Sequence, residues 1–397
     1  MDRRWELVVI GVVGYICLGT VYSWSVFREP LVETYGFSTA ETGIPYAVFL
    51  ALFAFTMPLG GWLQGRLGTR ITFLAGTALV GAAWLAAGTA RSIPALTITY
   101  GVIGGSGVGL AYGVPLAVVA SWFPGKRGLA MGLTLIGFGL SPFVTAPVAE
   151  AIIGSEGVAT AFTTLGIAFL VILAAASFFM KPAHEPKHLD SRTEGAVEPG
   201  PAQLLRDKRF WGLWITFALG TFAGLTAIGM SAAYGVEVVG ITGPAAAAAV
   251  AVFGVFNGAG RPLFGWITDR IGVRRAAILA YLVIVVGALL AVPAQGGAAV
   301  WYAVGFAILW LTLGGWLAIA PTATAGNFGR THYPANYGLV YTAYGVGALS
   351  GGAISGVLTA ATGTLVTSLF AVAGAAVVGL AVALWLLPRP HASGPAS

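Results

Sequence analysis

Gly265-Trp-Ile-Thr-Asp-Arg-Ile-Gly-Val-Arg274 is the stretch that decides the fold, because a segment with the same pattern, Gly-Trp-[Leu/Ile]-x-x-Arg-[Leu/Ile]-Gly-x-Arg, occurs earlier in the chain. The other copy, Gly61-Trp-Leu-Gln-Gly-Arg-Leu-Gly-Thr-Arg70, lies 204 residues earlier and also follows a long apolar segment. A second pair, Gly132-Leu-Thr-Leu-Ile-Gly-Phe138-Gly139 and Gly338-Leu-Val-Tyr-Thr-Ala-Tyr344-Gly345, repeats at an offset of 206 residues. Two matches at nearly one offset indicate two related halves that follow each other as parallel repeats.

Apolar residues dominate the composition. Hydrophobic residues make up 57% and charged residues only 9% of the 397 residues, and the mean hydropathy is +0.87. A soluble surface needs far more charge than this. Apolar stretches of about 20 residues, each long enough to cross a hydrocarbon core of roughly 30 Å, recur along the chain. The sequence therefore predicts an all-α membrane protein.

We expect twelve transmembrane helices in two six-helix, pseudo-symmetric halves. The predicted spans are 7–27, 43–65, 71–90, 95–121, 128–152, 158–180, 210–234, 245–268, 275–293, 299–325, 336–360 and 364–387. The longest polar stretch falls between the sixth and seventh spans. The predicted domains are thus an N-terminal half (1–180), a cytoplasmic linker (181–209) and a C-terminal half (210–397).

The distribution of basic residues predicts the orientation. All of the 20 Lys and Arg residues except Arg28, Arg91 and Arg261 fall on one side of the predicted spans. By the positive-inside rule that side is cytoplasmic, so both termini are expected inside a cell (inner or plasma) membrane. The same rule accounts for the pI of about 9.5, and the basic charge does not indicate nucleic-acid binding.

Arg261 is the basic residue that lies inside a predicted span. Burying a guanidinium in lipid costs at least roughly 2.5–3.5 kcal/mol, so such a residue normally faces a protein interior or a water-filled cavity. With the helix ending at residue 268, Arg261 lies about 10–12 Å deep at about 1.5 Å per residue. A guanidinium can hold a carboxylate through two parallel hydrogen bonds. We therefore predict that Arg261 binds an anionic substrate; the alternative is that it snorkels or pairs with backbone carbonyls.

Asn257 is four residues before Arg261 and shares its helix face. It is expected either to donate to a substrate hydroxyl or keto oxygen or to hold the Arg261 side chain. Aromatic and apolar residues are expected to line the remaining wall, although each such residue packs more often than it contacts a ligand. Tyr112 and Tyr344 are the favoured candidates because they lie near mid-span. The other candidates are Tyr341, Leu140, Tyr234 and Trp316.

The repeated loops resemble the cytoplasmic signature of the major facilitator superfamily, and this resemblance covers all twelve spans. Tyr22-Ser-Trp24-Ser-Val-Phe27 is similar to a first-helix signature of bacterial oxalate/formate-type antiporters, and Trp122-Phe-Pro-Gly-Lys-Arg127 resembles a motif of monocarboxylate transporters. Asn257-Gly-Ala-Gly-Arg261-Pro262 is similar to the eighth-helix pattern of that group, in which an Arg binds the substrate carboxylate. The resemblance implies alternating access around a site between the halves.

The chain departs from these families at four points. Monocarboxylate carriers of the mammalian type usually have Asp at the position of Asn257 and a Lys in the first helix, and this chain has neither. Tyr344 stands where oxalate exchangers carry a second cation, a Lys. Gly65 replaces the Asp that the second loop keeps as Asp269. One fixed cation neutralises one carboxylate, and a dianion would bring an unpaired charge into low dielectric at a cost of several kcal/mol. Tyr344 therefore favours small monocarboxylates such as lactate or pyruvate over oxalate.

Coupling and gating are predicted from the remaining charges. No Asp, Glu or His falls at mid-membrane depth in the sequence, so in the expected proton symport the proton rides on the substrate carboxyl or the Arg261–substrate pair gates the halves. Asp269 is expected at the N-terminus of the 128–152 helix, near Lys126 and Arg127, where helix-dipole attraction favours the outward-open state. Arg66 and Arg270 occupy the same loops. The alternative is that these charges only set topology.

The main functional prediction is a secondary transporter, and an oxalate/formate-type antiporter is the nearest alternative. A non-transporting membrane sensor and a membrane enzyme are weaker alternatives, since the sequence has no appended signalling domain and no nucleophile–base or metal constellation in its spans. The expected partners are a small monocarboxylate anion, a proton and the lipid bilayer. No cofactor, metal site, nucleic acid or obligatory protein partner is expected.

Overall fold

The computed structural model describes residues 3–38, 41–183, 198–294, 298–329 and 331–388, and every regular element in these ranges is a helix or a short helical turn. The elements before the linker are α1 (Arg3–Leu18), η1 (Gly19–Ser23), α2 (Trp24–Tyr35), α3 (Gly43–Ala87), α4 (Ile93–Leu96), η2 (Thr97–Gly104), α5 (Gly105–Trp122), α6 (Arg127–Glu156) and α7 (Val158–Ser177). The later elements are α8 (Pro201–Leu204), α9 (Lys208–Ala233), η3 (Tyr234–Val239), α10 (Gly243–Ile271), α11 (Val273–Ala291), η4 (Val292–Ala294), α12 (Ala299–Phe328), α13 (Tyr333–Thr362) and α14 (Val366–Leu386).

These helices account for twelve spans. Ten of the described helical segments are long and apolar enough to cross a membrane. One of them, α3, contains two predicted spans that meet at Gly68, whose φ of 82° interrupts the helical backbone. Helix α10 supplies the twelfth span. It extends to Ile271, three residues beyond the predicted end, so Arg261 lies ten residues, or about 15 Å, from the helix end rather than 10–12 Å.

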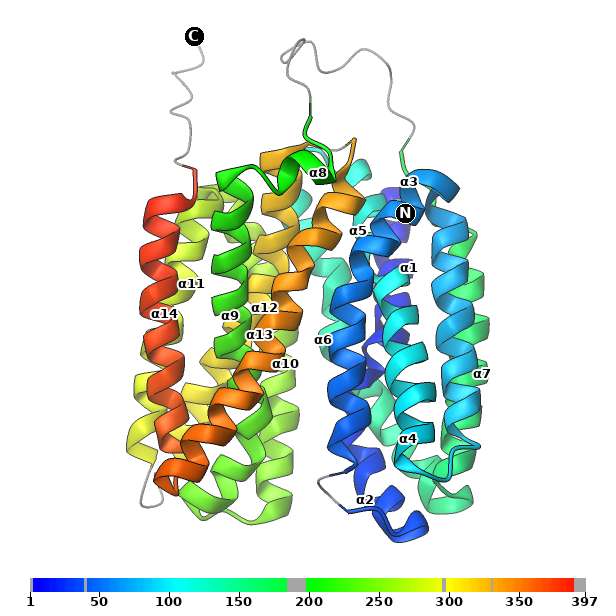
Figure 1. Cartoon of the computed structure of the whole chain (residues 1–397), viewed down its shortest axis with the longest axis vertical. Helices are drawn as coiled ribbons and strands as arrows, with labels where there is room; N and C mark the ends of the chain where they lie inside the picture. The colour runs from blue at the N-terminus through cyan, green and yellow to red at the C-terminus, as the bar shows by residue number, and fades with distance from the viewer. Residues whose placement is uncertain (1–2, 39–40, 184–197, 295–297, 330, 389–397) are drawn as a thin grey trace.

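The two sets of six spans lie side by side. Helices α1 to α7 form one half and α9 to α14 form the other, and the start of α1, the end of α14 and the described parts of the linker lie at the same end of the molecule (Figure 1). We call this the linker end and the opposite one the open end. The most extensive contacts between the halves pair α3 with α13 and α6 with α10. These two helix pairs, which we call the α3–α13 seam and the α6–α10 seam, are related by the sequence repeat.

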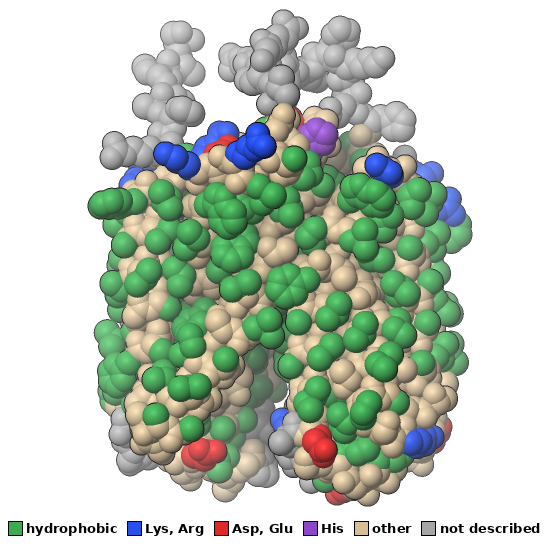
Figure 2. Space-filling view, viewed as in Figure 1, with side chains coloured by type: hydrophobic (Ala, Val, Ile, Leu, Met, Phe, Trp, Pro, Cys, Tyr) green, Lys and Arg blue, Asp and Glu red, His purple; other side chains and the backbone are tan. Residues whose placement is uncertain are grey.

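The seams are closed at the linker end. A Cβ atom placed on Gly61 of α3 would lie 2.2 Å from the carbonyl oxygen of Pro334, and one on Gly128 of α6 would lie 2.4 Å from that of Gly265. Glycine permits this backbone approach because it has no side chain. At the other end the surface is hollowed between the halves (Figure 2). The two seams are therefore in backbone contact at the linker end, and the halves are apart at the open end.

Side-chain hydrogen bonds attach the two ends of the linker to different halves. Thr69 of α3 donates to the Met180 carbonyl at 2.5 Å, and Ser121 of α5 accepts from the Ala183 N–H at 2.9 Å. These bonds hold the start of the linker on the N-terminal half. The central part of the predicted linker, 184–197, lies outside the described residues.

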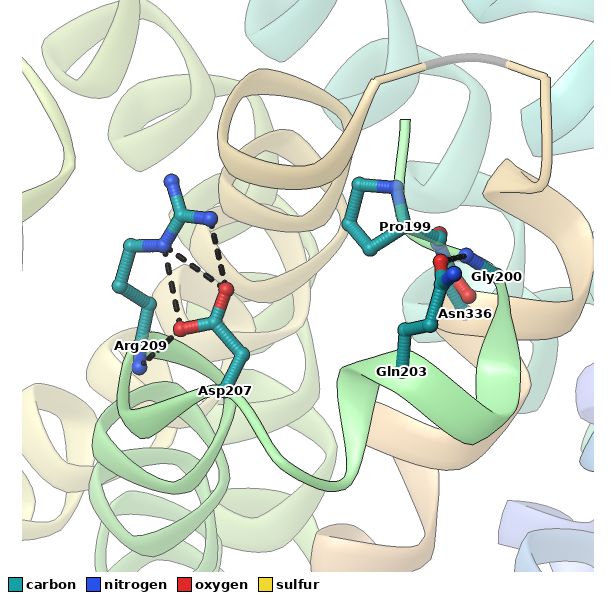
Figure 3. A network of polar contacts seen from close by, with 6 residues as sticks. All are labelled: Pro199, Gly200, Gln203, Asp207, Arg209 and Asn336. Carbon is teal, nitrogen blue, oxygen red and sulfur yellow. Dashed lines mark hydrogen bonds and ion pairs between the residues drawn. The ribbon is translucent and has the colours of Figure 1, made fainter. Parts of the chain in front are cut away.

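The end of the linker is attached to the C-terminal half (Figure 3). Asn336 of α13 donates through Nδ2 to the Pro199 carbonyl at 3.0 Å. Asp207 then caps α9 by accepting from the Arg209 N–H at 2.8 Å, and its carboxylate also pairs with the Arg209 guanidinium at 2.6 Å. The hydrogen bond from that guanidinium holds the pKa of the Asp207 carboxyl below its ordinary value. Each half therefore carries its own anchor for the linker.

Candidate functional site

Arg261 has no exposed surface, and of the side chains that the structure describes it is the only charged one that is buried. It belongs to α10 in the C-terminal half but reaches across the α6–α10 seam. Its Nη1 donates to the carbonyl oxygen of Leu135 on α6 at 2.8 Å, and its Nη2 donates to Asn257 Oδ1 at 3.1 Å. The guanidinium therefore lies between the two halves.

Asn257 orients the guanidinium, as one of its two predicted roles requires. Its Oδ1 accepts from Arg261 while its Nδ2 donates to the Trp310 carbonyl on α12 at 3.1 Å. The bond to Leu135 also agrees in part with the alternative that Arg261 pairs with backbone carbonyls. That pairing is incomplete, because Arg261 Nε is buried without a hydrogen-bond partner among the described residues. A buried unsatisfied donor costs about 1–3 kcal/mol, and more for a charged group.

An aromatic wall from the N-terminal half lies beside the guanidinium. The Phe138 ring of α6 is centred 5.6 Å from Arg261 Cζ. Tyr112, Tyr22 and Phe53 pack against Phe138 with ring centroids 5.4, 5.2 and 5.9 Å away. The Tyr112 side chain also interacts electrostatically with Arg261. Four different helical segments therefore contribute rings to one cluster, and Phe138 of this cluster lies close enough to Arg261 for cation–π stabilisation.

Tyrosines of α13 complete this wall from the C-terminal half. The Tyr341 ring lies 5.2 Å from that of Tyr112, and Tyr344 stacks on Tyr341 at 5.0 Å. The hydroxyl groups of Tyr344 and Tyr22 are hydrogen-bonded to each other at 3.0 Å. Both halves thus contribute to the same cluster.

The structure brings most of the predicted residues together. Arg261, Asn257, Tyr112, Tyr341 and Tyr344 belong to the cluster. Leu140 is beside it, because its side chain lies 3.2 Å from the position of a Cβ on Gly258, the neighbour of Asn257. These contacts agree with a shared site, although the part that each residue plays in binding remains a prediction.

Tyr234 and Trp316 are not in direct ring contact with the cluster. The Tyr234 hydroxyl donates to the Ala291 carbonyl at 3.0 Å, and its ring stacks on Tyr302. Trp316 is buried against Tyr281, with ring centroids 5.0 Å apart. It is linked to the cluster through Phe217, whose ring centroid lies 6.4 Å from that of Trp316 and 6.0 Å from that of Tyr341. The part that either residue plays in binding remains a prediction.

Sequence reasoning did not select Phe138, Tyr22, Phe53 or the Leu135 carbonyl. Two signals were available. Phe138 is the repeat counterpart of Tyr344, at the offset of 206 residues, and the structure places both in the same cluster. Tyr22 begins the first-helix motif. The Leu135 carbonyl had no signal, because a backbone acceptor has no residue signature.

Asp269 lies at the N-terminus of α6, where the sequence analysis expected it. Its Oδ1 accepts from the Gly128 N–H at 3.0 Å and its Oδ2 from the Leu129 N–H at 2.9 Å. Lys126 and Arg127 are the N-cap and first residue of the same helix. A carboxylate at a helix N-terminus is stabilised by the free N–H groups and the helix dipole. This contact joins the two halves at the linker end.

Arg66 and Arg270 are equivalent residues of the two loops, and they make equivalent contacts. The Arg66 guanidinium lies 4.4 Å from the ring centroid of Trp62, and that of Arg270 lies 5.3 Å from the ring centroid of Trp266. Both contacts are cation–π pairs within one helix. Their contribution to gating remains a prediction.

Comparisons with known proteins agree on the family. The family model of the Major Facilitator Superfamily matches residues 9–325 and 239–397. The oxalate:formate antiporter of Oxalobacter formigenes is 28% identical over 392 residues, which cover 98% of this chain and 93% of that protein. Monocarboxylate transporter 13 of Rattus norvegicus is 26% identical over 383 residues, covering 94% and 86%. The superfamily transporter FucP in its outward conformation superposes with a TM-score of 0.74 at 14% identity, covering 98% of this chain and 100% of FucP.

Proposed function

This chain belongs to the Major Facilitator Superfamily of membrane transporters, and on that premise we propose that it carries small monocarboxylates such as lactate or pyruvate by alternating access. Arg261 binds the substrate carboxylate at the interface between the halves, and a proton crosses with the substrate. The proposal deepens the family assignment, which by itself establishes a transporter rather than a substrate.

The unpartnered Nε of the fully buried Arg261 is the observation that carries this proposal. A carboxylate accepts two parallel hydrogen bonds from a guanidinium, so it would satisfy Nε and compensate the buried charge together. Asn257 already fixes the plane of the guanidinium through Nη2. The orientation needed for a two-point contact is therefore held before a substrate arrives.

The number of charges supports a monoanion. Among the described residues, no second Lys or Arg is buried with Arg261. Tyr344 contributes a hydroxyl group shared with Tyr22 instead of a cation. The second carboxylate of a dianion would remain unpaired in low dielectric, where the desolvation of each ion costs several kcal/mol. A hydroxyl or keto group next to the bound carboxylate would instead find the tyrosine hydroxyls.

The proposed orientation has the linker end in the cytoplasm, and the proposed state is outward-open. Most Lys and Arg side chains on the visible face gather at the linker end (Figure 2), and the positive-inside rule assigns such an end to the cytoplasm. The open end then faces outward, and the described molecule is outward-open. No Asp, Glu or His is buried among the described residues, so we propose that the proton travels with the substrate carboxyl.

An anion antiporter of the oxalate/formate type is the second candidate. The observation that favours it is the likeness to the Oxalobacter formigenes antiporter over 98% of this chain. The two candidates differ in the charge of the substrate and in the response to a pH gradient, and both differences can be measured on the purified protein.

Uptake of labelled lactate and oxalate into proteoliposomes tests the proposal. We expect saturable lactate uptake that accumulates against its gradient when the inside is alkaline. One pH unit corresponds to about 1.4 kcal/mol, which supports about tenfold accumulation for one-proton symport. Oxalate should compete at least about tenfold more weakly than lactate, because of its unpaired charge. Protein-free liposomes are the control. Saturable oxalate exchange that is indifferent to pH would favour the antiporter instead.

We expect Asp269→Asn to shift the population towards the inward-open state. The change removes one acceptor and the negative charge from the α6 N-terminus, so the closed linker end is destabilised by about 1–2 kcal/mol. This corresponds to a factor of about 5–30 in the equilibrium between the inward-open and outward-open states. Labelling of single cysteines at the open ends of α6 and α13, in a Cys17→Ala background, measures the shift. Asp207→Asn is the matched control, because Asp207 caps α9 within one half. Unchanged labelling in Asp269→Asn would contradict the gating role of Asp269.

A further inference from the structure

The sequence repeat makes the two seams equivalent at the linker end. Gly265 contacts Gly128 in the α6–α10 seam, and their repeat counterparts Gly61 and Pro334 contact each other in the α3–α13 seam. Asp269 therefore corresponds to Gly65, and the N-terminus of α6 corresponds to that of α13. Gly65 has no side chain, so it cannot supply to the second seam the carboxylate that Asp269 supplies to the first.

A cavity occupies the place of the missing carboxylate. A Cβ on Gly65 would meet no atom within 4 Å. The space beside it is a cavity of about 620 Å³ that both halves and the linker line. Its walls include Gly65 and Ala117 from the N-terminal half, Ala335 from the first turn of α13, and Pro182 and Pro201 from the two ends of the linker.

The charge of this cavity is positive. Its lining includes Arg66, Arg127 and His332, and no Asp or Glu is among the described residues that line it. The carboxylate of Glu198 lies nearby, but outside the lining, and accepts from the Thr331 N–H at 2.7 Å. The cavity thus presents two guanidinium groups and the N-terminus of a 30-residue helix to whatever enters it.

Unsatisfied polar atoms in the wall point to a ligand independently of the helix end. Gln64 lines the cavity and is 7% exposed, yet its Oε1 has no hydrogen-bond partner among the described residues. An amide oxygen accepts, so Gln64 would have to turn its NH₂ group towards an anionic ligand. Arg127 Nε, a donor, is also buried without a hydrogen-bond partner among the described residues. That donor favours an acceptor-rich ligand.

We propose that this cavity is a second anion site, which binds a small anionic group such as a phosphate or a carboxylate. The anion takes the role in the α3–α13 seam that Asp269 has in the α6–α10 seam. It connects Arg66 and Arg127 of the N-terminal half with the α13 N-terminus of the C-terminal half, and so stabilises the state that is closed at the linker end. Pro334 has no N–H, so it cannot donate to the anion as its counterpart Gly128 donates to Asp269. The anion therefore depends more on the two Arg side chains.

The proposed site regulates the transporter rather than carrying its substrate. With the linker end in the cytoplasm, as proposed above, a cytoplasmic anion would hold the outward-open state and slow the return of the carrier. The same anionic chemistry could come from a soluble ion or from the headgroup of an acidic lipid in the inner leaflet. The experiment below separates these sources.

Inorganic phosphate is the probe. The protein is reconstituted in zwitterionic lipid in an Arg261→Ala, Cys17→Ala background, which removes the central cation, and single open-end cysteines are labelled from outside. We expect phosphate trapped inside to raise the labelling rate about fivefold over chloride, equivalent to about 1 kcal/mol. A parallel sample with an acidic phospholipid and no phosphate tests the lipid source; an increase there assigns the headgroup as the ligand.

Gly65→Asp tests the position of the site. It ties a carboxylate to the place where the anion binds, so we expect fast labelling without phosphate and no further response to it. Gly65→Ala is the matched control and should respond as the parent does, because its added methyl group meets open space. Arg66→Gln should weaken the phosphate response without a change in monodispersity.

Three outcomes would overturn the proposal: no response of the parent to phosphate or to acidic lipid, a full response that persists in Gly65→Asp, or a full response in Arg66→Gln. A response to external instead of internal phosphate would support the anion site but contradict the proposed orientation. Labelling needs no transport, so failure of the monocarboxylate proposal in the uptake assay is a separate result.

Discussion

Arg261→Ala is expected to abolish saturable lactate uptake. Removing one partner of a buried ion pair costs about 3–5 kcal/mol, because the other charge is left uncompensated. The affinity for lactate should therefore fall by at least about a hundredfold. The measurement is initial uptake over a range of lactate concentrations, together with the thermal shift that lactate causes in the purified protein. The thermal shift reports binding even if transport is lost for another reason.

The accompanying variants separate charge from geometry. Arg261→Lys keeps the charge but loses the planar fork and the Nε donor, so it should bind lactate more weakly than the wild type and more tightly than Arg261→Ala. Arg91→Ala is the control, because it removes an Arg that donates to the Gly88 and Ala90 carbonyls within the N-terminal half. Near-normal lactate uptake by Arg261→Ala would contradict the proposed site.

Gly61→Ala is expected to prevent closure of the linker end almost completely. The new Cβ would lie 2.2 Å from the Pro334 carbonyl oxygen and 2.5 Å from Ala335 Cα, and both are backbone atoms that cannot rotate away. Overpacking of this kind costs about 1–3 kcal/mol and occasionally more. The clash destabilises the described outward-open state and is relieved when α3 and α13 separate. The ratio of inward-open to outward-open molecules should therefore rise by up to about a hundredfold.

Gly65→Ala is the matched control for this shift. It lies one turn further along α3, and its Cβ would meet nothing within 4 Å. Both changes alter helix propensity in the same direction, so a difference between them reports the clash. The measurement is cysteine labelling at the open end, which should fall in Gly61→Ala, and at the linker end, which should rise. Equal labelling of the two variants would show that α3 and α13 do not approach as described.

The fold was largely predictable from local patterns. Segment length and hydropathy predicted the twelve helices, and the repeated loops predicted their division into two halves. The details that failed depend on how a helix ends. The span predicted to end at residue 268 continues as helix α10 to Ile271, because nothing before the Gly272 turn, with φ of 81°, stops it. Arg261 is consequently deeper than the sequence indicated.

The site was predictable only where its residues are neighbours in the chain. Helical spacing brought Asn257 and Arg261 to one face, and the structure confirms that they are hydrogen-bonded. The partners of Arg261 on α6, the Leu135 carbonyl and the Phe138 ring, are more than 120 residues away in sequence. Their positions follow from packing across the α6–α10 seam, which no single-helix pattern encodes. Trp316 has the residue type of a site wall but packs inside one half.

The hydrogen bond from Arg261 to the Leu135 carbonyl has a mechanical consequence for the proposed transport cycle. The guanidinium is at once the ligand for the substrate and a fastener between the two halves. A carboxylate bound at Nε neutralises the guanidinium, so the charge-assisted hydrogen bond from Nη1 to Leu135 weakens when the substrate arrives. Recognition of the substrate and loosening of the contact between the halves would then be one event. A carrier built in this way needs no separate trigger to sense that it is loaded.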